Sequence, residues 1–187
     1  MLNRLITMAA VAVGGAYLVK RMQNPNTDQN NSSVRETITV NVPVRVAYDQ
    51  FTQFEEFPNF MDSVHEIKQL DDKRLHWKAD VMGKPIEWDA EITEQIPDQR
   101  IAWHSVNGTP NGGVVTFETL SDSRTRVTLQ MTYEPQDAIE KVGDALGAVR
   151  AEAKANLKRF KQMIEQRGQE TGAWRGTITD QGQSAVH

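Results

Sequence analysis

Few side chains in this sequence have the type and spacing of acid–base catalysts. Glu87, Asp89 and Glu91 recur at every second position, and two such carboxylates could serve as general acid and general base if they were buried together. They alternate with the apolar residues of the same segment, so we interpret them as one solvated strand face. His65 shares strand parity with Ile67 and is the histidine best placed to reach an interior space, although an ordinary strand histidine is the simpler interpretation.

Three tryptophans carry the stronger signal. Trp77, Trp88 and Trp103 lie on segments in which apolar and polar residues alternate, which is the pattern of half-buried antiparallel strands. Their large flat side chains therefore share one face of a sheet. That face either packs tightly under a helix or encloses an apolar ligand, because apolar pockets with few polar groups are the usual small-molecule sites. We favour the ligand.

The composition excludes several classes of function. The formal net charge of −4 argues against nucleic acid as the main partner. The 187 residues include no cysteine, so disulfides, thiolate metal sites and cysteine nucleophiles are ruled out, and the four histidines lack the spacing of a helical metal site. The glycine-rich segment 107–113 joins two strands rather than opening a helix, which argues against a phosphate-binding loop. We predict no catalytic residue, no metal and no cofactor.

The N-terminus carries an uncharged, mostly apolar stretch from Leu5 to Val19, flanked by Arg4 and by Lys20 and Arg21. A helix of that length rises roughly 22 Å, short of the ~30 Å hydrocarbon core, and snorkelling basic side chains could close the gap. A secretion signal and a soluble or partner-bound helix are the alternatives. The excess of basic residues after the stretch predicts a membrane-associated protein whose main domain is cytoplasmic.

The chain divides by composition into four predicted parts. These are an anchor helix over residues 1–22, a disordered polar linker over 23–33, a folded domain over 34–167 and a flexible polar tail over 168–187. Trp174 is the one unusual residue of the tail. It could belong to a docking peptide, but local packing on the domain is the interpretation we favour.

Within the folded domain the order of elements is readable. We predict a strand over 36–42, a helix that begins at Pro43, a short helix over 54–57, strands over 64–70, 74–81, 86–92, 100–106, 114–120 and 125–133, and a long helix over 137–166. A two-residue turn at Met82 and Gly83 would set Trp77 opposite Trp88. It would also pair opposite charges across the hairpin, with Arg74 facing Glu91, His76 facing Asp89 and Lys78 facing Glu87.

The long helix changes character along its length. Its first half contains Gly143, Ala145, Gly147 and Ala148, and its second half is bulkier and basic. Small residues opposite large aromatic ones can leave an internal space. We therefore expect Gly147 to border that space, so that a leucine there would fill it.

Three segments resemble one superfamily. They are Val40 to Tyr48, Phe54 to Met61 and Ile101 to Ser105, and with the order of elements they resemble the START, polyketide-cyclase and birch-pollen-allergen (SRPBCC) superfamily, nearest to its polyketide cyclase/dehydrase and coenzyme-Q-binding group. The resemblance covers roughly residues 34–167. It implies an α+β helix-grip fold, with a curved seven-stranded antiparallel sheet wrapped on a long C-terminal helix and two short helices after strand one. Its members bind lipids, quinones, steroids or polyketides, and only some are enzymes.

Together these features predict a membrane-tethered binding or carrier protein for a lipid, fatty acid or isoprenoid quinone. The residues expected to line the cavity are Phe54, Phe57 and Phe60 at the mouth, Trp77, Trp88, Trp103, Phe117, Leu129 and Met131 in the walls, and Leu146 and Val149 on the helix side. Two alternatives stay open. One is a cyclase or dehydratase that would use polar groups such as Ser105, Thr119 or His65, and the other is a stress-related interaction module whose core is filled by its own side chains.

Overall fold

The computed structural model describes residues 32–187 except 82, 109, 134–141, 180–181 and 185–187. The predicted anchor and linker, residues 1–22 and 23–33, lie largely or wholly outside that part. The described elements are β1 (Ser32–Val40), α2 (Val44–Phe51), η1 (Phe54–Asn59), β2 (Val64–Gln69), β3 (Arg74–Val81), β4 (Lys84–Ile96), β5 (Arg100–Ser105), β6 (Asn111–Ser121), β7 (Arg124–Tyr133), α3 (Val142–Arg167), β8 (Thr177–Thr179) and β9 (Gly182–Ser184).

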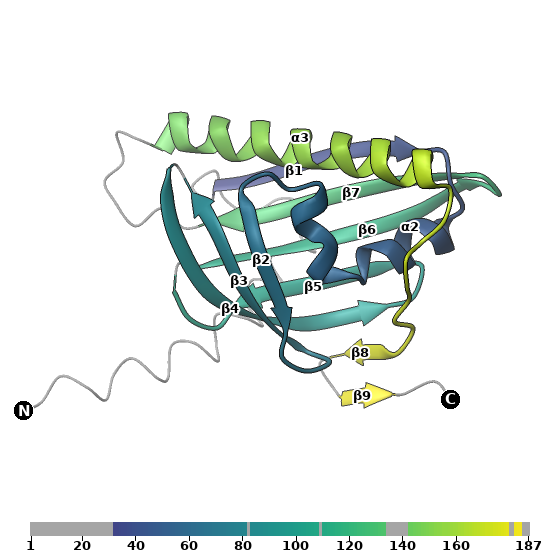
Figure 1. Ribbon diagram of the computed structural model, residues 1–187, viewed down its shortest axis with the longest axis horizontal. Helices are drawn as coiled ribbons and strands as arrows, with labels where there is room; N and C mark the ends of the chain where they lie inside the picture. The colour runs from purple at the N-terminus through teal and green to yellow at the C-terminus, as the bar shows by residue number, and fades with distance from the viewer. Residues whose placement is uncertain (1–31, 82, 109, 134–141, 180–181, 185–187) are drawn as a thin grey trace, which may run out of the picture. The chain divides into compact units, whose positions relative to one another are not determined.

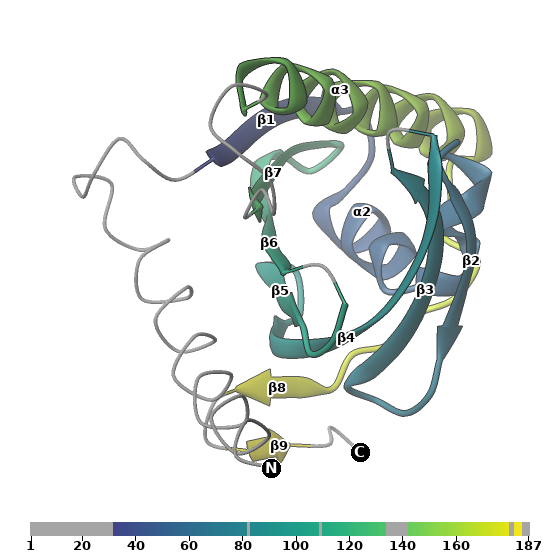
Figure 2. The same cartoon turned by 90° about the vertical axis from the view of Figure 1, so that its left-hand side faces the viewer.

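The strands form a curved antiparallel sheet that wraps around α3. The main path runs β1-β7-β6-β5-β4-β3-β2, so β1 and β2, which are separated in sequence by α2 and η1, lie at its two ends (Figure 1). Figure 2 shows the sheet in cross-section, with α3 lying along its open side next to β1 and with α2 inside the curve. The predicted α+β helix-grip fold is confirmed. Strand β4 is longer than predicted, because a register shift between Ile92 and Glu94 lets it continue through the bend of the sheet.

The β3–β4 hairpin has the predicted register. Val81 pairs with Lys84, and Trp77 lies opposite Trp88. The three charge pairs also face one another as predicted, since Arg74 pairs with Glu91, His76 with Asp89 and Lys78 with Glu87. Gly83 has φ +77°, a backbone conformation that glycine adopts without strain in a tight turn.

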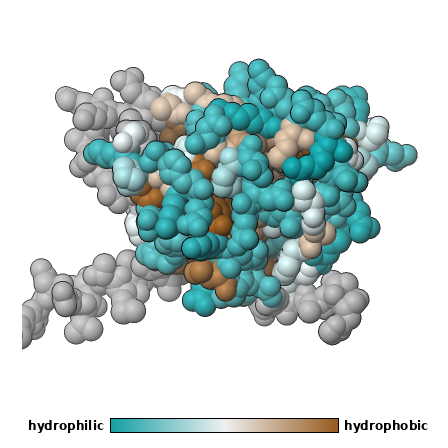
Figure 3. Space-filling model, viewed as in Figure 1, coloured by the Kyte–Doolittle hydropathy of each residue, from teal (hydrophilic) through white to brown (hydrophobic). Residues whose placement is uncertain are grey.

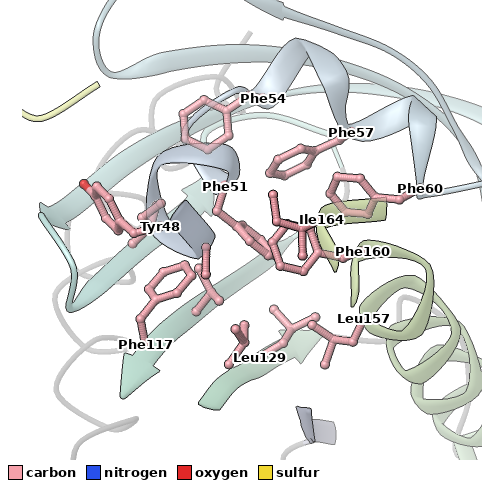
Figure 4. Close-up of a cluster of buried hydrophobic side chains, with 14 of the residues drawn as sticks. Tyr48, Phe51, Phe54, Phe57, Phe60, Phe117, Leu129, Leu157, Phe160 and Ile164 are labelled. Atoms are coloured by element: carbon pink, nitrogen blue, oxygen red, sulfur yellow. The ribbon is translucent and has the colours of Figure 1, made fainter. Parts of the chain in front are cut away.

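The core is densest under the second half of α3. Phe51 and Phe160 meet with ring centroids 4.6 Å apart, and Phe60 lies 5.4 Å from Phe160. Figure 4 shows these rings, together with Phe57 and Ile164, converging between η1, α2 and α3. Edge-on aromatic contacts of this kind add to the free energy gained by burying the rings. This cluster therefore fixes α3 against α2 and η1 at one end of the domain.

The tail differs from the prediction of a loose segment. Strand β8 pairs with β4 through Ile178 and Gln95, and Ile178 is fully buried. The pairing of β4 with β3 ends at Glu91. The pairing of β4 with β8 lies beyond that residue, so β8 covers an edge of β4 that β3 leaves free. Trp174 packs against the core cluster, in line with local packing rather than a docking peptide.

The buried carboxylate of Asp49 helps to hold the C-terminal tail against the domain. Asp49 of α2 is inaccessible to solvent, and Arg175 donates to its Oδ1 at 2.7 Å and to Asp98 Oδ2 at 2.6 Å. Burial raises the pKa of Asp49, and the hydrogen bond from Arg175 opposes that shift. Nearby, Gln50 accepts a hydrogen bond from the Thr171 N–H at 3.0 Å. We call Asp49, Asp98 and Arg175 the Arg175 cluster.

The predicted membrane location is wrong for the part of the chain that the structure describes. Across residues 32–187, outside the gaps named above, no helix is both long and apolar enough to cross a bilayer. The stretch on which the prediction rested, residues 1–22, lies outside the described residues. We therefore withdraw the membrane anchor and the cytoplasmic placement that depended on it.

Replacing Arg175 by alanine should lower the free energy of unfolding by about 2–4 kcal/mol, because it leaves the buried Asp49 without its main partner. The loss should narrow as the pH falls, since a protonated Asp49 no longer needs the guanidinium. Urea titrations at several pH values would measure both effects.

Arg45→Ala is the matched control. Arg45 also contacts Asp49, at 3.4 Å, but its side chain is 67% exposed, so we expect a change below about 1 kcal/mol. Equal losses for the two variants would show that the Arg175 cluster does not hold the tail.

Candidate ligand-binding site

An internal cavity of about 350 Å³ lies between the sheet and the first half of α3. Its described lining is mostly aromatic and aliphatic. The lining residues are Phe51, Phe54, Phe57, Phe60, Met61, Ser63, Val64, Leu75, Trp77, Ala79, Asp80, Trp88, Ile92, Ile101, Trp103, Asn111, Val115, Leu129, Met131, Ala148, Val149, Glu152, Ala153, Asn156 and Leu157. Figure 3 shows apolar surface near the middle of one face, surrounded by hydrophilic residues.

Most of the residues expected to line a cavity are brought together there. These are Phe54, Phe57, Phe60, Trp77, Trp88, Trp103, Leu129, Met131 and Val149. Phe117 and Leu146 are not among the lining residues. Phe117 packs edge-on against Tyr48 at 5.5 Å and Phe51 at 5.6 Å in the filled part of the core. Leu146 packs beside the core cluster.

The side chains of α3 explain why the space exists. Ala148, Val149 and Ala153 face the cavity, whereas Phe160 and Ile164 are fully buried in the filled region. The predicted change from small to large side chains along the helix is therefore confirmed. The prediction that Gly147 borders the cavity is wrong. Gly147 is exposed, and a Cβ added there would meet nothing within 4 Å, because Gly147 lies on the solvent side of the helix.

Two tryptophans form one wall. The rings of Trp77 and Trp88 stack with centroids 5.5 Å apart and an angle of 14° between their planes. Phe57 meets Trp77 edge-on at 6.0 Å. This pair is a direct result of the hairpin register, because directly opposed residues of antiparallel strands place their side chains side by side on one face. The wall is thus a flat aromatic surface fixed by two strands and η1.

The third tryptophan is positioned by a glycine. Trp103 of β5 pairs with Gly113 of β6. A Cβ on Gly113 would lie 2.6 Å from Trp103 Cη2, so the indole folds directly across the glycine. The absence of a side chain at residue 113 therefore determines how Trp103 enters the lining.

Five of the described lining residues are polar, namely Ser63, Asp80, Asn111, Glu152 and Asn156. Ser63 donates to Glu152 Oε1 at 3.1 Å, and Asp80 lies 2.9 Å from His65 Nε2. Further along α3, Asn156 accepts a hydrogen bond from Arg159 at 2.9 Å. Within the described residues, no group of three or more histidine, cysteine, aspartate and glutamate side chains could hold a metal ion.

Three polar residues considered for catalysis lie elsewhere. His65 does not line the cavity, because a register shift between Val64 and Glu66 turns it outward, where its side chain is 56% exposed. Ser105 accepts the Asn111 N–H at 3.0 Å outside the lining, and Thr119 is exposed. Asp80 has the same strand parity as the outward-facing Lys78, yet it borders the cavity at the end of β3.

Replacing Gly113 by alanine should displace the Trp103 ring and lower the free energy of unfolding by about 1–3 kcal/mol through overpacking. The near-ultraviolet circular dichroism of the tryptophans should change with it. Gly147→Ala is the control, because its added methyl meets open space and favours the helix. An unchanged spectrum and stability for Gly113→Ala would contradict this role of the glycine.

The sequence matches one family over most of the folded part. Residues 40–161 match the family described as polyketide cyclase / dehydrase and lipid transport. An uncharacterized 17.2 kDa protein in the melC2-rnhH intergenic region of Streptomyces lincolnensis is 54% identical over 148 residues, which is 79% of this chain and 99% of that protein.

Solved structures agree with the fold. The Zhui aromatase/cyclase of a Streptomyces species aligns with a TM-score of 0.65 at 16% identity, over 76% of this chain and 98% of that one. The protein DR_A0006 of Deinococcus radiodurans is 28% identical with a TM-score of 0.55, over 72% of this chain and 98% of that one. A START superfamily protein of Mycobacterium smegmatis has a TM-score of 0.59 at 14% identity, over 72% of this chain and 95% of that one. This chain therefore belongs to the polyketide cyclase / dehydrase and lipid transport family.

Proposed function

We propose that this chain is a binding or carrier protein for an apolar small molecule, which it holds in the cavity between the sheet and α3. The observation that carries the proposal is the cavity of about 350 Å³, lined mainly by phenylalanine, tryptophan and aliphatic side chains. This volume is within the range of small-molecule sites. Burial of apolar surface would supply the affinity, at about 25 cal/mol for each Å² removed from water.

The small side chains of α3 support the same function. A helix that only closed a core would be expected to carry large residues along its whole buried face, as Leu157, Phe160 and Ile164 do. Ala148, Val149 and Ala153 instead leave the space beside Trp103 and Met131 open. This distribution favours a site for a ligand over a core completed by the protein's own side chains.

A cyclase of the aromatase type is the second candidate, because the solved structures that share this fold include aromatase/cyclases. Such chemistry needs an acid or base inside the cavity. Of the described lining residues, Asp80 and Glu152 carry carboxylates, and each is already paired, with His65 and Ser63 respectively. Both also lie near solvent, with the Asp80 side chain 46% exposed. The geometry therefore favours binding over catalysis.

Replacing Val149 by tryptophan should block uptake of N-phenyl-1-naphthylamine, an uncharged dye whose fluorescence rises in apolar surroundings. Val149 lines the cavity, so we expect the larger ring to occupy the ligand space and weaken dye binding by about tenfold or more. Fluorescence titration would measure the affinity, and thermal unfolding would check the fold.

Gly147→Leu is the matched control, because it adds bulk two residues away on the solvent side of α3. It should bind the dye like the wild type. A wild type that takes up no dye, or equal binding by the wild type and Val149→Trp, would overturn the proposed function.

A further inference from the structure

Asn156 is a buried polar residue in a mostly apolar cavity wall. It is only 8% exposed, and it lines the cavity from α3, between Ala153 and Leu157. Burying an amide without hydrogen bonds costs free energy, so the polar atoms of a buried amide usually have partners. The hydrogen bond that Asn156 makes, and the one that it lacks, therefore indicate what the cavity offers to a ligand.

The amide oxygen of Asn156 is already bonded. Arg159 donates from Nη1 to Asn156 Oδ1 at 2.9 Å, and its Nη2 atom pairs with Asp62. A guanidinium can only donate, so the amide atom that faces Arg159 must be the oxygen. This contact fixes the orientation of the amide and leaves its NH₂ group as the free end.

The amide nitrogen of Asn156 has no hydrogen-bond partner among the described residues. Its Nδ2 atom is not one of their fully enclosed unpartnered atoms, so it keeps surface that a small molecule can reach. Arg159 lies one turn toward the C-terminal end of α3 and holds the oxygen on that side. The nitrogen diverges from the oxygen and is therefore directed back along the helix, toward Ala153 and the cavity under the first half of α3.

We infer that Asn156 is a specificity-determining residue of the cavity: its amide N–H donates to an oxygen acceptor of the ligand, such as the carbonyl oxygen of a ketone, quinone or ester. The inference rests on the proposed function, because it needs a ligand in the cavity. Arg159 is a positioning residue, since it engages the amide oxygen and so presents the nitrogen to the cavity. Purely hydrocarbon ligands would leave this donor without a partner and should bind less tightly.

Two planar probes of similar size test the inference. 9-Fluorenone carries one carbonyl acceptor, and fluorene carries none. Equilibrium dialysis with absorbance detection gives the two affinities, and their ratio measures the preference for an acceptor. The wild type should bind fluorenone about three- to tenfold more tightly than fluorene, as expected for one added hydrogen bond.

Asn156→Ala and Asn156→Leu both remove the donor, but alanine enlarges the cavity and leucine fills part of it. The affinity of each probe should therefore change in both variants. The ratio of the two affinities should fall to about onefold or below, because the carbonyl then loses its hydrogen bonds to water without gaining a donor. Val149→Ala is the matched control. It changes the volume of the lining and removes no polar group, so both affinities should change while the ratio stays that of the wild type.

Arg159→Met tests the positioning from outside the cavity, because Arg159 is not among the described lining residues. Without the guanidinium the amide of Asn156 is free to turn, so the preference for fluorenone should fall below that of the wild type. A preference equal to that of the wild type would show that Arg159 does not position the amide.

Nuclear magnetic resonance keeps the inference testable if the Asn156 variants do not fold. Nitrogen-15 labelling of the wild type gives signals for the side-chain amides, and triple-resonance spectra assign the pair of protons that belongs to Asn156. Fluorenone should move one of these protons downfield of its position in the fluorene complex, because only fluorenone accepts a hydrogen bond from it.

The outcomes separate the two proposals. If neither probe binds the wild type, both the proposed function and this inference fail. If fluorene and fluorenone bind equally well, or if the Asn156 variants keep the preference, the cavity binds ligands but Asn156 does not select them. The same conclusion follows if the Asn156 amide signals are identical in the two complexes.

Discussion

The structure depends on how one helix, α3, packs into a curved sheet. At one end Phe160 and Ile164 are fully buried, and the Phe160 ring packs against Phe51 and Phe60. Nearer the start of the helix, the smaller residues Ala148, Val149 and Ala153 line the cavity instead. Close packing at the first end holds the sheet open at the second, because a rigid interior does not collapse around a missing side chain at no cost. The cavity is a consequence of this difference along α3.

The remaining parts stabilise that arrangement from outside. The β3–β4 register fixes the Trp77–Trp88 wall, and Gly113 sets the Trp103 ring beside it. At the far end, the Arg175 cluster and Ile178 tie the C-terminal segment to α2 and β4. Since α2 also carries Phe51, which lines the cavity, the tail contributes to holding the walls in place.

The fold could be predicted from the sequence because its signals are local. The alternation of apolar and polar residues predicted the strands. Pro43 predicted the start of the first helix, and the pairing of opposite charges predicted the register of the hairpin. The tail could not be predicted, because Ile178 is an isolated apolar residue and the partners of Arg175, Asp49 and Asp98, are distant in sequence. Composition therefore indicated a loose segment.

The site was only partly predictable for similar reasons. Parity identifies which face of a regular strand is buried, so the three tryptophans were placed together. Parity does not predict the orientation of a side chain at a register shift, as at His65, or at the end of a strand, as at Asp80. A stripe of small residues shows that a helix leaves space, but it does not show which of them face that space, so Gly147 was assigned to the wrong side.

The central claim is that the cavity holds a ligand in the cell. Native mass spectrometry of the full-length protein, purified gently and without detergent, tests it most directly. The account predicts a species heavier than the 21.1 kDa chain, whose extra mass is removed by organic extraction and belongs to an apolar compound. A protein of bare chain mass in every preparation, with no uptake of added apolar compounds, would contradict it.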